Sequence, residues 1–141
     1  MKSQVPIEEQ INSVISLYSS GHIEAAINAV EILIQDNPYE AKLQNISGIC
    51  YAALGKVDSA VLCYEEALKI KPNYIEALNN LGITFHNLGQ PDEAVKKYKQ
   101  AIAIKPDYAE ALNNLGITLM ELDHLEEAVK SYEKALAINP N

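Results

Sequence analysis

The sequence predicts an all-α fold, a solenoid of four helix-turn-helix repeats with about eight helices in 141 residues. Proline and glycine, which end or break helices, recur with a period of 34 residues. Between these breaks, apolar residues recur every three or four positions, which is the spacing of an amphipathic helix. The prolines that keep the period are Pro38, Pro72, Pro106 and Pro140.

Aligning the chain on this period divides it into four repeats, which we expect to form a single domain covering residues 1–141. The repeats are 7–40, 41–74, 75–108 and 109–141. The first is degenerate, since Val14 stands where the others carry Gly48, Gly82 and Gly116. An atypical first repeat is expected of an N-terminal cap.

Each repeat is expected to contain two helices. In the third repeat the first helix runs to about Leu88, where Gly89 supplies the left-handed conformation that ends a helix. The second helix begins at Pro91, because a proline in the first turn removes no helical hydrogen bond, and it ends before Pro106. The first helices of the second and fourth repeats should end in the same way near Leu54 and Leu122.

Small residues recur where the two helices of a repeat must approach closely, because larger side chains there would push them apart. They are Gly48, Gly82, Gly116, Ala60, Ala94 and Ala128. A single helical hairpin cannot bury its apolar side alone, so the repeats are expected to stack on one another.

These positions resemble the tetratricopeptide repeat, whose pattern is Trp-x2-Leu-Gly-x2-Tyr, then Ala-x3-Phe, then Pro. The third repeat carries Leu78, Leu81, Gly82, Phe85, Ala94, Tyr98, Ala101 and Pro106, and the fourth carries Leu112, Leu115, Gly116, Leu119, Ala128, Tyr132, Ala135 and Pro140. The Trp is missing from every repeat. The resemblance implies a right-handed superhelix with a concave groove lined by the first helix of each repeat.

The groove residues that the resemblance implies lie on the side of each first helix opposite the stack. They are Lys42, Asn45, Ile49, Glu76, Asn79, Asn80, Ile83, His86, Asn87, Glu110, Asn113, Asn114 and Ile117. Asn costs several tenths of a kcal/mol relative to Ala inside a helix, so its repeated use suggests a role. A side-chain amide can both donate to and accept from a peptide backbone. The row resembles the asparagine ladder of O-linked N-acetylglucosamine transferases and, by analogy, of importin-alpha. The alternative is that these residues brace neighbouring helices.

The charge balance restricts the partners. The chain has 19 acidic residues against 11 basic ones, all of them Lys, and a net charge of -8. Nucleic acid is not expected, because phosphate binding needs a basic surface. With no Arg, and with Glu8, Glu76 and Glu110 in the groove, the chain should repel an acidic tail of the kind held by a carboxylate clamp. A neutral or basic peptide segment is the expected partner.

The sequence offers no set of residues for catalysis, a metal or a cofactor, so we expect no enzyme and no cofactor. The three histidines, His22, His86 and His124, lie in different repeats without a metal-binding spacing. Cys50 and Cys63 form no CxxC motif. Without a secretion signal or an apolar span, a cytoplasmic location and no membrane partner are expected.

The second helix of the last repeat should be partly uncovered, since no repeat follows to bury it. The residues concerned are Leu125, Val129, Tyr132 and Leu136. The favoured function is a non-catalytic interaction module that binds a peptide segment in the groove. The alternatives are an assembly unit that self-associates as a homo-oligomer through this last helix, and a substrate-recruiting fragment of a larger enzyme such as a glycosyltransferase.

Overall fold

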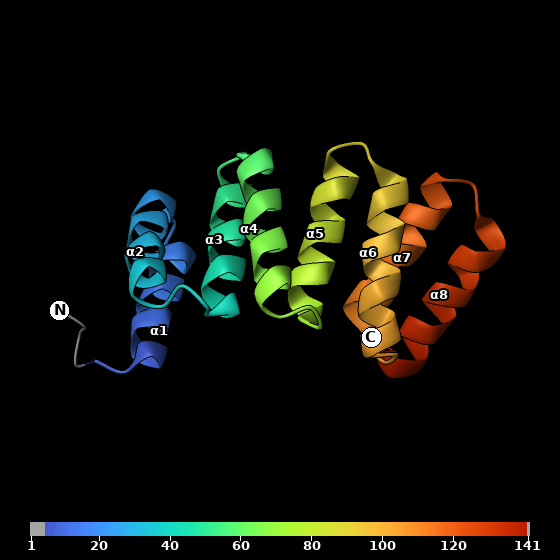
Figure 1. Ribbon diagram of the computed structural model, residues 1–141. Helices are drawn as coiled ribbons and strands as arrows, with labels where there is room; N and C mark the ends of the chain where they lie inside the picture. The colour runs from blue at the N-terminus through green and yellow to red at the C-terminus, as the bar shows by residue number, and fades with distance from the viewer. Residues whose placement is uncertain (1–4, 141) are drawn as a thin grey trace. The chain divides into compact units, whose positions relative to one another are not determined.

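The computed structural model describes residues 5–140, and this part of the chain forms eight α-helices without a strand (Figure 1). They are α1 (Ile7–Ser19), α2 (Ile23–Asp36), α3 (Ala41–Ala53), α4 (Val57–Ile70), α5 (Ile75–Asn87), α6 (Pro91–Ile104), α7 (Ala109–Glu121) and α8 (Leu125–Ile138). Each odd-numbered helix begins at the first residue of an expected repeat. The predicted all-α fold of helix-turn-helix repeats is therefore confirmed.

The chain divides into two compact units between Pro72 and Asn73, with two repeats in each. In the first unit, α1 packs against α2 and α3 against α4, and α2 also contacts α3. In the second unit, α5 packs against α6 and α7 against α8, and α6 also contacts α7. The two helices of each repeat run in opposite directions (Figure 1). The second helix of one repeat thus packs on the first helix of the next within each unit.

The turns between paired helices follow the expected glycine pattern with one exception. Gly55 and Gly89 have φ angles of 76° and 74°, in the left-handed region, and end α3 and α5 as predicted. In the last repeat Asp123 occupies the equivalent position with φ 64°. Aspartate is one of the few other residues that adopt this conformation, because its short polar side chain can bond locally.

The two units have separate apolar cores. In the first, Ile11, Val14 and Leu43 are almost fully buried and connect α1 with α3. In the second, Tyr98 of α6 packs with Leu115 of α7, and both belong to a cluster that also contains Ala94, Leu119 and Ala128. Burial of such side chains is the main favourable contribution to folding.

The stability of the fold is expected to fall as the pH rises above 10. Burial raises the pKa of Tyr98 to about 12, and burial followed by the charge of Glu110 raises that of Tyr108 to about 12. The hydrogen bond to Glu31 raises the pKa of Tyr51 to about 12. In the unfolded chain these hydroxyls lose their protons near pH 10, so the unfolded state releases protons first and becomes favoured between pH 10 and 12.

Urea unfolding followed by circular dichroism across this pH range would test that expectation. The midpoint should decrease as the pH rises, and it should decrease less steeply in a Tyr98→Phe variant, which lacks one of the titrating hydroxyls. A midpoint independent of pH above 10 would contradict the expected linkage between tyrosine burial and stability.

Candidate functional site

The sides of α5 and α7 that point away from the core of the second unit form one surface, which we call the α5–α7 face. Residues three, four or seven positions apart lie on the same side of a helix. The residues of this face therefore form one row on α5 and an equivalent row on α7. They are Glu76, Asn80, Ile83, His86 and Asn87 on α5, and Glu110, Asn113, Asn114, Ile117, Met120 and Glu121 on α7. Every one of them is exposed or half-buried.

One expected member of this surface, Asn79, is instead buried, with 1% of its surface exposed. Asn114 of α7 donates a hydrogen bond from its side-chain nitrogen to the side-chain oxygen of Asn79 at 3.1 Å. The placement of Asn79 on the ligand-facing side is therefore corrected, because α7 lies beside α5 and its Asn114 reaches this amide. For Asn79, the alternative role of bracing neighbouring helices applies.

A second polar contact crosses from α5 to α7. His86 Nε2 lies 2.6 Å from Glu121 Oε2, and the two side chains are 28% and 53% exposed. This pair and the Asn79–Asn114 pair both join residues 35 positions apart. Alignment on a 34-residue period pairs residues that are 34 positions apart. It does not reveal contacts between residues that are 35 positions apart. The pairing of His86 with Glu121 was missed for that reason, and an offset of one repeat plus one residue would have found it.

An apolar patch lies on the same face. Ile117 and Met120 of α7 are 45% and 51% exposed, and Ile83 of α5 is half-buried against the core of the second unit. Met120 was expected on the groove side of this helix, as the equivalent of His86 in the preceding repeat. Asn113 shares the side of α7 that carries Ile117 and Met120. The face therefore combines amides with exposed apolar side chains.

The charges on the α5–α7 face are acidic. Glu76 and Glu110 lie in the first turns of α5 and α7. The hydroxyl of Tyr108 donates to Glu110 Oε2 at 3.4 Å. No lysine is among the residues that make up the face, so its carboxylates give it a negative potential.

The expected site residues of the first unit are less available to a ligand than those of the second unit. Lys42 Nζ lies 3.7 Å from Glu8 Oε2 of α1 in an exposed ion pair. Asn45 is buried, with 6% of its surface exposed, and Ile49 is half-buried. The expectation that Asn45 faces a ligand is corrected, because α3 is buried all around this point, where the residues from Asn45 to Gly48 are all buried.

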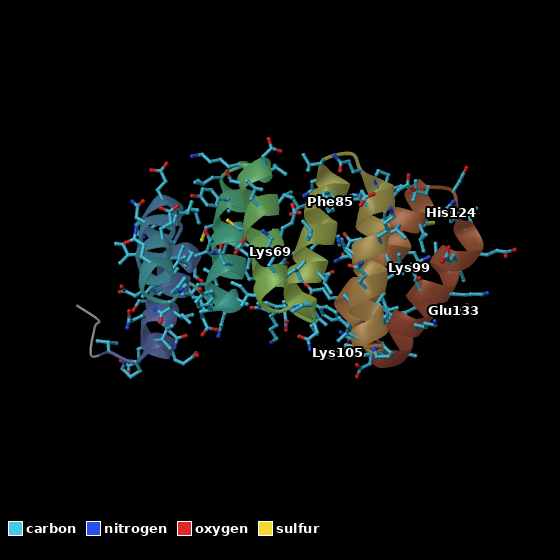
Figure 2. All side chains as sticks on the ribbon, viewed as in Figure 1. Lys69, Phe85, Lys99, Lys105, His124 and Glu133 are labelled. Carbon is cyan, nitrogen blue, oxygen red and sulfur yellow. The ribbon has the colours of Figure 1, made fainter. Side chains whose placement is uncertain are left out.

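The expected uncovered surface of the last helix is present. Leu125, Val129 and Leu136 of α8 are 53%, 51% and 58% exposed, and Tyr132 is half-buried. We call these four residues the α8 face. Lys99 of α6, labelled in Figure 2, makes an ion pair with Glu127 at 2.9 Å near the start of α8. That exposed contact does not involve the residues of the α8 face.

Chemically reactive groups are sparse in the part of the chain that the structure describes. Among residues 5–140, His, Cys, Asp and Glu side chains form no group of three that could hold a metal ion. Burial raises the pKa of the Cys50 and Cys63 thiols, and the thiol form is a weak nucleophile. None of the described helices is long and apolar enough to cross a membrane.

Solved structures with the same fold include several of MamA. A crystal structure of MamA is 22% identical with a TM-score of 0.86, and the match covers 95% of this chain and 78% of that one. MamA from Desulfovibrio magneticus RS-1 is also 22% identical, with a TM-score of 0.83 over 94% of this chain and 75% of that one. The first TPR of Spaghetti (RPAP3), bound to the HSP90 peptide SRMEEVD, is 29% identical with a TM-score of 0.70, over 72% of this chain and 80% of that one.

Comparison at the level of sequence identifies the repeats directly. A comparison with curated proteins found no match. A family model of the TPR repeat matches residues 50–89 and 84–123, and a model of the tetratricopeptide repeat matches residues 109–141. The matched residues make up more than half of the sequence, and the protein belongs to the tetratricopeptide repeat family.

Proposed function

We propose that the protein is a non-catalytic interaction module that binds an extended segment of a partner protein on the α5–α7 face. The observation that carries the proposal is the exposure of Ile117 and Met120 beside the amide side chains of the same surface. Apolar side chains of a peptide can pack on such a patch while its backbone bonds to the amides. Membership of the tetratricopeptide repeat family supports an interaction module, as does the RPAP3 repeat bound to an HSP90 peptide.

The amides cannot supply the affinity alone. Asn80, Asn113 and Asn114 would contribute roughly 0.5 to 1.5 kcal/mol for each net hydrogen bond, whereas micromolar binding requires about 8 kcal/mol. The remainder must come from apolar contacts, for which Ile117 and Met120 are the exposed candidates. The amides then fix the backbone of the peptide, as in the asparagine ladder that they resemble, and the patch selects its side chains.

The acidic potential of the face determines the kind of segment. Glu76, Glu110 and Glu121 would attract lysine or arginine side chains and repel carboxylates. The HSP90 peptide bound by the RPAP3 repeat, SRMEEVD, contains three acidic residues. A neutral or basic segment is the better partner for this chain, and the two proteins should differ in this preference.

The preference can be measured with two fluorescent heptapeptides, SRMEEVD and the charge-reversed SRMKKVK with an amidated end. The lysine peptide should bind more tightly, and its affinity should fall as salt is added, because exposed charge pairs are screened. A Glu76→Gln, Glu110→Gln variant should lose most of the difference, whereas Asp58→Asn on α4 should retain it. Tighter binding of SRMEEVD, or no binding of the lysine peptide at about 1 mM, would contradict the proposed preference.

Association through α8 is a second candidate function. It is favoured by the exposure of Leu125, Val129 and Leu136 on one side of a single helix, since contiguous exposed apolar residues mark interaction surfaces. A homo-oligomer is one form that this association could take. It would appear as a mass that rises with concentration in sedimentation experiments.

A further inference from the structure

A chain of side-chain hydrogen bonds links α5 with α7 under the α5–α7 face and ends at Asn114. The hydroxyl of Tyr108, the residue before α7, donates to Glu110 Oε2 at 3.4 Å. A further hydrogen bond joins this hydroxyl to the side-chain amide of Asn79, which is 1% exposed. Asn79 Oδ1 in turn accepts a hydrogen bond from Asn114 Nδ2 at 3.1 Å. The buried Asn79 amide of α5 therefore connects the start of α7 with its middle.

The direction of this chain is set at Glu110, because an ionised carboxylate only accepts hydrogen bonds. The Tyr108 hydroxyl gives its proton to Glu110, so its oxygen accepts a hydrogen bond from the Asn79 nitrogen. Asn79 then has its oxygen left for Asn114, which must present its nitrogen. The side-chain oxygen of Asn114 is the part of this amide that stays available, and within residues 5–140 it accepts no hydrogen bond.

The available oxygen of Asn114 matches one group of an extended peptide. Asn114 is half-buried on the α5–α7 face, and every peptide residue except proline offers a backbone N–H donor. We propose that Asn79 is a positioning residue, which holds Asn114 so that its side-chain oxygen accepts a hydrogen bond from a backbone N–H group of the bound segment. This role rests on the proposed binding of a segment to the α5–α7 face.

Positioning affects affinity because a freely rotating side chain must be ordered when a ligand binds. Asn113 is exposed, and among the described residues its side chain makes no hydrogen bond, so it loses its rotamer freedom on binding. Asn114 is already ordered by Asn79 in the free protein. Its hydrogen bond to a peptide should therefore be favoured by a factor of about three to ten over that of a freely rotating amide.

The test uses the full chain, the fluorescent lysine heptapeptide SRMKKVK with its amidated end, and versions that each carry a methyl group on one backbone nitrogen. The methyl group removes one N–H donor, and fluorescence anisotropy gives the affinity that it costs. At one nitrogen, methylation should weaken binding to wild type about fivefold and leave binding to Asn114→Ala almost unchanged. The same methyl group should have a smaller effect in Asn79→Ala. It should keep its full effect in Asn113→Ala, the matched control.

Comparison of methylated and unmethylated peptides separates positioning from bracing. If Asn79 only braced α5 against α7, Asn79→Ala would weaken the binding of all these peptides by the same factor. A second measurement needs no substitution at Asn79, and so does not depend on the folding of that variant. NMR relaxation of the side-chain NH2 groups in the free wild type should show the Asn114 amide to be more rigid than the Asn113 amide.

Two kinds of result would overturn the positioning role alone. Methylation effects that are the same in wild type and Asn114→Ala would show that Asn114 accepts no N–H group. An effect that Asn114→Ala removes but Asn79→Ala leaves intact, or an Asn114 amide as mobile as that of Asn113, would show that Asn79 does not position it. If the unmethylated peptide failed to bind wild type at about 1 mM, the proposed function itself would fail, and the positioning role with it.

Discussion

Replacing Tyr98 with alanine is expected to lower the free energy of unfolding by about 3 to 5 kcal/mol, the largest effect of any substitution considered for this fold. The ring is 2% exposed and packs in one cluster with Ala94, Leu115 and Leu119. Truncation would leave a cavity between α6 and α7, and the surrounding helices can close it only in part. Urea unfolding followed by circular dichroism would measure the loss.

The equivalent substitution in the last repeat provides the control. Tyr132 is half-buried and lies at the uncovered surface of α8, so Tyr132→Ala removes less buried area and leaves no enclosed cavity. Its cost should be clearly smaller, about 1 to 2 kcal/mol on the scale of the apolar area involved. Equal losses for the two variants would show that α7 does not enclose Tyr98 in the way described.

Gly82→Ala is expected to destabilise the protein by about 1 to 2 kcal/mol, although alanine is the better helix former. A Cβ atom at Gly82 would lie 2.5 Å from Cε1 of Tyr98. Overpacking of this kind costs about 1 to 3 kcal/mol, and the gain in helix propensity offsets about 1 kcal/mol of it. The clash prevails because the Tyr98 ring is buried on both sides and cannot move aside.

Gly116→Ala is the control that distinguishes the cost of the clash from the gain in helix propensity, because it gives the same gain with a smaller clash. A Cβ atom there would lie 2.8 Å from Cε1 of Tyr132, but that ring is half-buried and can turn toward solvent. We therefore expect a change close to zero for Gly116→Ala, measured by the same urea unfolding. If both substitutions had the same effect, the distinction between an enclosed and an uncovered ring would be wrong.

The fold could be predicted from sequence because its signals are local and repeated. The proline period placed repeat boundaries at residues 7, 41, 75 and 109, and the structure begins a helix at each of these positions. The first helices of the last three repeats were predicted to end near Leu54, Leu88 and Leu122, and each ends one residue earlier; at two of these ends Gly55 and Gly89 dictate the backbone. The use of Asp123 in place of a fourth glycine, after Gly21, Gly55 and Gly89, could not be anticipated from the pattern.

The candidate site was predicted less well, because it depends on contacts between helices that are one repeat apart. Sequence periodicity shows which side of a helix a residue occupies, and on the side that it indicated Asn113 and Ile117 are exposed and Asn80 is half-buried. Periodicity does not show how far one helix is shifted along its neighbour, and so which residues of α5 and α7 come into contact. That offset decides that Asn79 is buried beneath Asn114 and that His86 meets Glu121.

The central claim, that the α5–α7 face binds the partner, is tested most directly by comparing the proteins captured from source-cell lysate by three forms of the chain. These are wild type, the Ile117→Glu, Met120→Glu variant and the Leu62→Glu control, each first checked for equal helicity. All three substituted side chains are exposed, so folding should be preserved. Loss of partners from the face variant alone is the predicted result. Recovery of the same partners by all three forms would contradict the claim.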